Sequence, residues 1–185
     1  MTKRERISRQ VPLMILWAML SALVWSFVFN IITDTDPTRK LTLFADAETP
    51  GAAELAAELE KETGAGIRMV KVHPFTYAMM DASEINGSDL YIVSEERFDE
   101  FAAWYAPVPE SLRDGHTLRE SDGEPRGILI HDPEAAPDQA WIRFGQQRYY
   151  LTFGVKSRHL PGGEDPVDAE AVACAEHLLR LFQTQ

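Results

Sequence analysis

Polar side chains that could hold a ligand follow three apolar, strand-like runs in the first half of the sequence. They offer carboxylate, hydroxyl, imidazole and phenol groups, which suit a small polar solute, a cation or a peptide. The residues are Asp46, Glu48, Thr49, His73, Tyr77 and Ser94. If the three runs form parallel strands, their carboxyl ends meet at one edge of a sheet, where α/β proteins bind ligands. The sequence therefore predicts a ligand site at this edge.

A purely structural interpretation explains part of the same pattern. The run SDLYIVSEERFDEFAAW places Ser94 directly after an apolar strand and before a helix-like repeat. A serine at that position caps a helix, and Glu95 and Glu96 would lie in its first turn, where the helix dipole favours negative charge. Both interpretations, a ligand site and a helix junction, stay open at this point.

No set of residues has the spacing that a catalytic mechanism or a metal centre needs. The five histidines are scattered through the chain, and Cys174 is the single cysteine, so it has no partner for a disulfide, a thiolate zinc cluster or a redox pair. The sequence contains no Gly-rich phosphate loop and no nucleophile elbow. We therefore expect no enzyme activity, no metal and no cofactor.

The elements that must position these residues alternate between strand and helix. LTLFADAE (41–48) and IRMVKVHPF (67–75) are strand-like, and residues 90–93 form a short, continuously apolar run of the kind typical of buried parallel strands. Thr49 as N-cap and Pro50 as first residue predict a helix that stops at Gly64. Shorter helices are expected over 77–85 and 98–105. The order β-α-β-α-β-α predicts a parallel sheet covered by helices.

The second half has a different pattern. RGILIHD, AWIRFG and RYYLTFGV are three strand-like runs with short connections, and we expect them to add antiparallel strands to the sheet. A last helix is predicted from Asp165-Pro166 to Phe182, with an apolar stripe that includes Val167, Cys174 and Leu178. Cys174 is therefore interpreted as a small buried apolar group.

The amino-terminal segment predicts a membrane anchor. Residues 1–10 carry four Lys and Arg against one Glu, and residues 11–32 contain no charge. These 22 residues would make a helix of about 33 Å, enough to cross a hydrocarbon core of ~30 Å. A cleavable signal peptide is the alternative, but its apolar region is usually shorter and ends in a small-x-small site, which is absent here. Basic residues before the span favour a cytoplasmic N-terminus.

This interpretation divides the chain into four parts: a cytoplasmic basic tail (1–10), a single transmembrane helix (11–32), a linker (33–40) and an extracytoplasmic α/β domain (41–185). Without the charges of the first ten residues, the chain keeps 14 Lys and Arg against 28 Asp and Glu. Such an acidic domain is not expected to bind nucleic acid. Its expected location is the cell membrane, with the domain outside.

The strand and helix progression resembles the first lobe of the extracellular solute-binding proteins that serve ABC transporters. The resemblance rests on LTLFADAE, IRMVKVHPF, SDLYIVSEERFDEFAAWYAPVP and YYLTFGVKSRHL, and it covers roughly Leu41 to Leu160. Ser88 to Glu96 and the Pro-bearing Ala106-Pro107-Val108-Pro109 carry most of it. It implies a single periplasmic-binding-protein-like lobe with a mixed, mostly parallel sheet. The family clamps its ligand between two lobes, for which about 145 residues do not suffice.

Two functions are consistent with these features. The first is a membrane-anchored extracytoplasmic interaction or accessory module with a degenerate solute-binding-protein-like fold, in a bacterial envelope complex. Its expected partners are the lipid bilayer and a membrane protein such as a transporter. The alternative is an anchored receptor or sensor that binds a small solute, a cation or a peptide at the carboxyl edge of the sheet.

Overall fold

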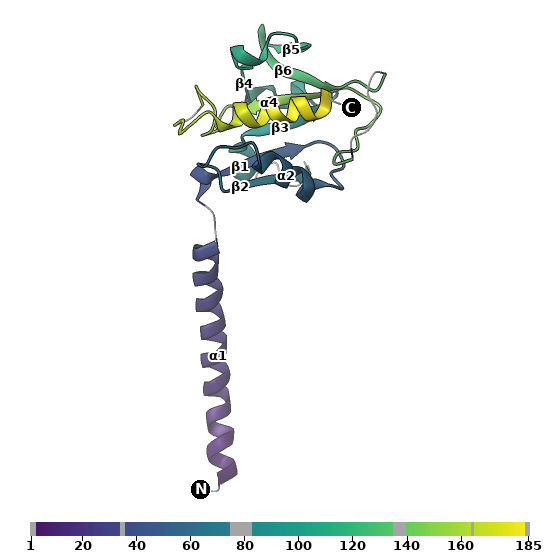
Figure 1. Ribbon diagram of the computed structural model, residues 1–185. Helices are drawn as coiled ribbons and strands as arrows, with labels where there is room; N and C mark the ends of the chain where they lie inside the picture. Colours follow the sequence, from purple (N-terminus) through teal and green to yellow (C-terminus); the bar gives the residue numbers. More distant parts are fainter. Residues whose placement is uncertain (1–2, 34–35, 75–82, 135–139, 164, 184–185) are drawn as a thin grey trace. The chain divides into compact units, whose positions relative to one another are not determined.

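The computed structural model describes residues 3–33, 36–74, 83–134, 140–163 and 165–183. The chain divides into two units, one ending at Asp36 and one beginning at Pro37 (Figure 1).

The first unit is one long helix, α1 (Lys3–Thr33). The basic residues that precede the apolar run thus belong to the same helix as the run itself. Its stretch Val11–Val28 is long and apolar enough to cross a membrane, and none of that stretch is buried. A signal sequence near an N-terminus can have the same length and composition.

The second unit is a mixed α/β domain with a sheet of seven strands among the described residues. The strand order is β2-β1-β3-β7-β6-β5, and β4 pairs with β7. The strands are β1 (Lys40–Ala45), β2 (Met69–Pro74), β3 (Leu90–Ser94), β4 (Tyr105–Ala106), β5 (Leu118–Ser121), β6 (Glu124–His131) and β7 (Tyr149–Gly154). β1 is parallel to both β2 and β3, and the other pairings are antiparallel. The predicted α/β class with a mixed sheet is confirmed, but the expectation of a mostly parallel sheet is wrong, because only two of the six strand pairings in the described part of the chain are parallel.

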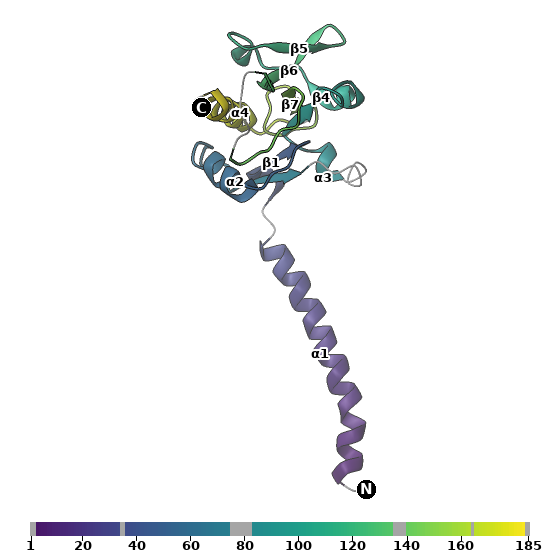
Figure 2. The ribbon, with the colours of Figure 1, turned by 90° about the vertical axis from the view of Figure 1, so that its right-hand side faces the viewer.

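Helices cover both faces of this sheet, which explains why its central strands are apolar throughout. Figure 2 shows α2 (Ala52–Glu60) and α4 (Glu170–Gln183) on one side and the short α3 (Ser83–Asn86) on the other. Because side chains alternate along a strand, Leu41 and Leu43 point into the core under α2 and α4, whereas Phe44 points into an aromatic cluster on the opposite face. β3 divides its side chains between the faces in the same way.

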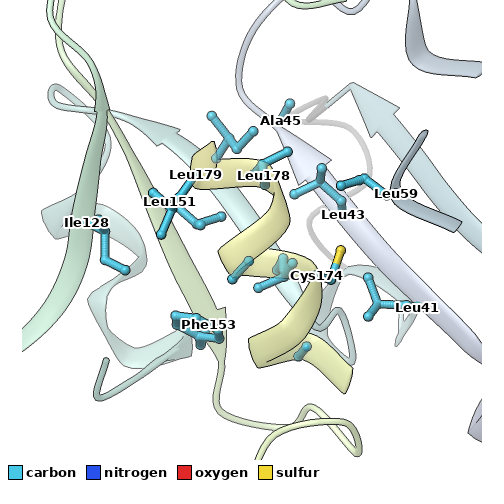
Figure 3. Packing of buried hydrophobic residues seen from close by; sticks show 14 of the residues in the cluster. Leu41, Leu43, Ala45, Leu59, Ile128, Leu151, Phe153, Cys174, Leu178 and Leu179 are labelled. Atoms are coloured by element: carbon cyan, nitrogen blue, oxygen red, sulfur yellow. The ribbon is translucent and has the colours of Figure 1, made fainter. Parts of the chain in front are cut away.

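The core under α4 is a continuous apolar layer, mostly aliphatic (Figure 3). Leu178 and Leu179 of α4 pack there with Leu43 of β1 and Leu151 of β7. Cys174 is fully buried in the same layer, as its place in the apolar stripe predicted. Full burial of side chains of this size contributes about 1.5–3 kcal/mol each, so this layer is a main source of the domain's stability.

The second half of the domain differs from the prediction at one strand. RGILIHD and RYYLTFGV form β6 and β7, but AWIRFG forms no strand and makes only an isolated bridge between Arg143 and Glu48. Its alternating pattern has another cause, because Ile142 and Phe144 lie outside the strands and are buried against the core. The short strands β4 and β5 were not predicted.

Three of the predicted helices also differ from the structure, and the first of them, α2, ends at Glu60 rather than at Gly64. α2 begins after Gly51, which approaches Trp141 so closely that a Cβ at residue 51 would lie 2.9 Å from the Trp141 Cα. Thr49 is therefore not the N-cap. α4 begins at Glu170, since the Asp168 carboxylate accepts the Glu170 N–H at 3.0 Å, and Val167 is 56% exposed rather than part of the stripe.

The third difference follows β3. The predicted helix over 98–105 is a 3-10 helix, Asp99–Trp104, preceded by turns. Its N-cap position is occupied by Phe98, with no side-chain cap. Ser94 thus ends β3 five residues before the helical segment starts at Asp99, and the prediction that Ser94 caps a helix is wrong.

Candidate functional site

The carboxyl ends of β1 and β3 are brought together by their parallel pairing. Ala45 is opposite Ile92, and the Asp46 N–H donates to the Ile92 carbonyl at 2.7 Å. The Asp46 carboxylate therefore faces Ser94, whose hydroxyl donates to its Oδ2 at 2.5 Å. Because β2 lies on one side of β1 and β3 on the other, the strand order reverses here. Open α/β sheets place their ligand sites at such a switch point.

Arg97 completes this group, and sequence reasoning missed it. Its Nη1 donates to Asp46 Oδ1 at 2.9 Å, so each carboxylate oxygen of Asp46 accepts a hydrogen bond. The ion pair is partly exposed, with 32% of the Arg97 side chain and 15% of the Asp46 side chain accessible. Arg97 lies three residues beyond Ser94, in a turn, and no local pattern in the sequence indicated this contact.

Three of the other predicted site residues, Glu48, Thr49 and His73, make contacts elsewhere. Glu48 is exposed, and its backbone carbonyl accepts the Arg143 N–H at 2.9 Å. The carbonyl of Thr49 accepts the Ala52 N–H as the chain turns into α2. His73 lies on β2 and stacks on Phe44, with the ring centroids 5.3 Å apart. Tyr77 lies outside the described residues.

A second charged group lies next to the first, around Arg119 of β5. The Arg119 guanidinium donates to Glu95 at 3.2 Å and to Asp99 at 3.0 Å. It also lies over the Phe98 ring, 4.6 Å from the centroid. The Tyr150 hydroxyl donates to the same Glu95 carboxylate at 3.4 Å. Acidic side chains at this edge of the sheet are thus held by basic side chains of the domain itself.

A third polar group is buried at the amino end of β3, and nothing in the sequence pointed to it. Asp89 is 4% exposed, and its carboxylate accepts the Thr42 N–H at 2.8 Å and the Ser157 hydroxyl at 2.6 Å. Burial raises the pKa of Asp89 above its usual value, while these hydrogen bonds act in the opposite direction. Nearby, the His159 ring meets the Asp168 carboxylate, with 2.9 Å between Nδ1 and Oδ1.

The chemistry that these groups can perform is limited. Burial raises the pKa of the Cys174 thiol to about 12, so it stays protonated and unreactive. No group of three His, Cys, Asp or Glu side chains arranged for a metal ion occurs among the described residues. What the carboxyl edge offers is one hydrogen-bonded Asp46–Ser94–Arg97 group, hereafter the switch-point triad, which suits the binding of a polar molecule or the bracing of two strands.

Replacing Ser94 with alanine tests the bracing contribution of the switch-point triad. Because a hydrogen bond to a charged group is worth about 1.5–3 kcal/mol and Arg97 still holds Asp46, we expect Ser94→Ala to lower the free energy of unfolding by about 1–2 kcal/mol. Chemical denaturation followed by circular dichroism measures this change. Ser121→Ala is the control, at the end of an edge strand. An equal loss in both variants would contradict a specific role of Ser94.

Comparison of the chain with protein-family models and with curated proteins gives no match.

Proposed function

We propose that the chain is a membrane-anchored interaction module, in which α1 crosses the membrane and the mixed α/β domain lies outside the cytoplasm as an accessory part of a bacterial envelope complex. The observation that carries the proposal is the uncharged stretch Val11–Val28, in which the large apolar side chains from Val11 to Phe27 are exposed. Soluble proteins rarely expose so large a continuous apolar surface, whereas lipid covers it without cost. The basic residues at its start favour a cytoplasmic N-terminus.

The outer domain is proposed to be a single solute-binding-like lobe that contacts proteins rather than capturing solutes. Support comes from the carboxyl edge of the sheet, where Asp46 is held by Ser94 and Arg97 and where Arg119 holds Glu95. Side chains already bound to one another must break these contacts before a solute can use them, which costs affinity. A protein partner with a large interface depends less on any single polar group.

A receptor for a small solute, cation or peptide is the second candidate. It is favoured by the place of the switch-point triad, since Asp46 and Ser94 lie where the strand order reverses. Isothermal titration calorimetry of the chain in detergent, against a panel of amino acids, sugars, short peptides and divalent cations, distinguishes the two functions. Binding heat that is measured with one class of ligand and is absent in the Arg97→Ala variant would support the receptor function. No binding across the panel would support the interaction module.

The anchor is tested by deleting residues 1–33 and comparing the shortened chain with the full one. We expect the full chain, at 20.9 kDa, to stay with the membrane pellet after an alkaline wash and the shortened chain to be soluble. Protease added to spheroplasts should degrade the domain, because the basic residues keep only the N-terminus inside.

The signal-sequence alternative gives a different outcome in the same experiment. Mass spectrometry of the mature protein would then find a chain that lacks the apolar stretch and that is released by osmotic shock. A domain fully protected from protease in spheroplasts would contradict the proposed orientation.

A further inference from the structure

The outer edge of β2 carries a contact that resembles strand pairing. β2 is the last strand of the sheet order and pairs with β1 on one side only, within the described part of the chain. The Val70 N–H donates to Glu60 Oε1 at 2.9 Å, and Glu60 is the exposed last residue of α2. A side-chain carboxylate oxygen thus accepts a strand N–H as the backbone carbonyl of a neighbouring strand does.

The edge is continuous beyond this one contact. Amide direction alternates along a strand, so the Val72 N–H points outward as the Val70 N–H does. The side chains of Val70 and Val72 pack in the core with α2, which fixes the register of the edge. An incoming strand would therefore meet a fixed row of backbone groups.

The charge of this edge differs from that of the domain. Arg68 and Lys71 occur within four residues, in a domain with about twice as many acidic as basic residues. A second copy of β2 would bring like charges together, which is unfavourable across paired strands. An acidic segment would be attracted and oriented by the same residues.

We propose that the outer edge of β2 binds an extended acidic segment of a partner protein by strand addition, and that Glu60 occupies the place of the partner's carbonyl group in the unbound domain. This assignment rests on the proposed interaction function and names the partner's chemistry. Main-chain hydrogen bonds supply the affinity in this mode of recognition. Glu60 leaves easily because it is exposed to solvent.

The test uses the full chain in detergent micelles and two blocked hexapeptides, one alternating Glu and Val and the other alternating Lys and Val. Amide hydrogen exchange at Val70 and Val72 is the measurement. At a concentration about ten times its dissociation constant, the acidic peptide should slow exchange at both amides roughly tenfold. The basic peptide should leave both rates unchanged.

Glu60→Ala sharpens the test, because it removes the group that competes for the Val70 N–H. We expect Glu60→Ala to increase the affinity for the acidic peptide roughly 3–10-fold. The control is Glu58→Ala, which should not change this affinity, because the Glu58 side chain pairs with Lys61 on the same helix. Equal protection by both peptides, or none at about millimolar concentration, would overturn the proposal. Self-association of the Glu60→Ala variant through β2 would also overturn the proposal. Glu60 would then serve only to prevent pairing with a second copy of the chain.

Failure of this test and failure of the membrane anchor are distinguishable. Peptide binding at β2 does not depend on α1, so a chain released from the membrane that still binds the acidic peptide would overturn the anchor alone. A membrane-bound chain without protection at Val70 and Val72 would overturn the strand-addition site alone.

Discussion

Asp89→Ala is expected to lower the free energy of unfolding by about 2–4 kcal/mol, because it removes the acceptor of two donors in the interior. The Thr42 N–H and the Ser157 hydroxyl both donate to this carboxylate, and both residues lie in strands or segments far from residue 89 in the sequence. Alanine offers no acceptor, and the buried site admits little water. Denaturant titration of the two proteins measures the difference.

Asp89→Asn separates hydrogen bonding from charge. Burial raises the pKa of Asp89 in the folded domain, from an ordinary value of 3.8. A raised pKa means that the folded protein binds the proton more tightly than the unfolded chain, so Asp89 contributes most stability below 3.8 and loses it as pH rises through the folded value. We therefore expect the native protein to gain stability relative to Asp89→Asn as pH falls from 7 towards 4.

The measurement is the difference in unfolding free energy between the two proteins at several pH values. Contributions of carboxylates that do not interact with residue 89 cancel in this difference. Cys174 is buried near Asp89 but stays protonated throughout this range. His159 and Asp168 are present in both proteins, but each interacts with the Asp89 charge, so that interaction is part of the measured difference. A difference that moves in favour of Asp89→Asn on acidification would show that the hydrogen bonds lower the pKa by more than burial raises it.

Gly154→Ala is expected to be the most damaging single methyl addition in the domain, with a loss of at least about 3 kcal/mol. A Cβ at residue 154 would lie 1.9 Å from the Ser88 carbonyl oxygen. Gly154 lies in β7 and Ser88 lies two residues before β3, and both atoms are fixed by the backbone, so neither can rotate away as a side chain could. The Gly154 N–H also donates to the Asp89 carbonyl at 2.9 Å, and separation of the strands would weaken this bond.

Gly66→Ala is the matched control for Gly154→Ala. Its Cβ would have one neighbour, an Asp168 carboxylate oxygen at 3.9 Å, which is ordinary van der Waals contact. We expect a change within about 0.5 kcal/mol there. Thermal unfolding of both variants compares them directly. Equal melting temperatures for the native protein and Gly154→Ala would show that the β3–β7 pairing can spread at low cost.

The parts of the fold that the sequence predicted well are those with strong periodicity. The β1-α2-β2 and β3 segments and the last helix depend on apolar runs whose spacing matches one secondary structure. The prediction of a strand at AWIRFG failed for a clear reason. Ile142 and Phe144 alternate as they would in a strand, but they belong to a loop and are buried against the core. The turn Asp122-Gly123, with positive φ at both residues, joins β5 to β6. That dipeptide is a hairpin signal and could have revealed β5.

The candidate site was predictable only in part, since contact between side chains depends on register. Parallel pairing placed Asp46 next to Ser94, as expected for loops at one edge of a sheet. The cap assigned to Ser94 was wrong because turns, not a helix, follow β3. Arg97 and Ser157 meet their aspartates from 51 and 68 residues away, and no local pattern encodes such pairs.

The burial of Cys174 has a practical consequence for any spectroscopic study of this protein. Its thiol is inaccessible and stays protonated at neutral pH, so maleimide and methanethiosulfonate reagents should not modify it in the folded chain. A cysteine introduced at an exposed position, such as Lys156→Cys, would then accept a fluorophore or spin label by itself. The native cysteine therefore need not be replaced before labelling. Distances and mobility at the introduced label can be measured without altering the core.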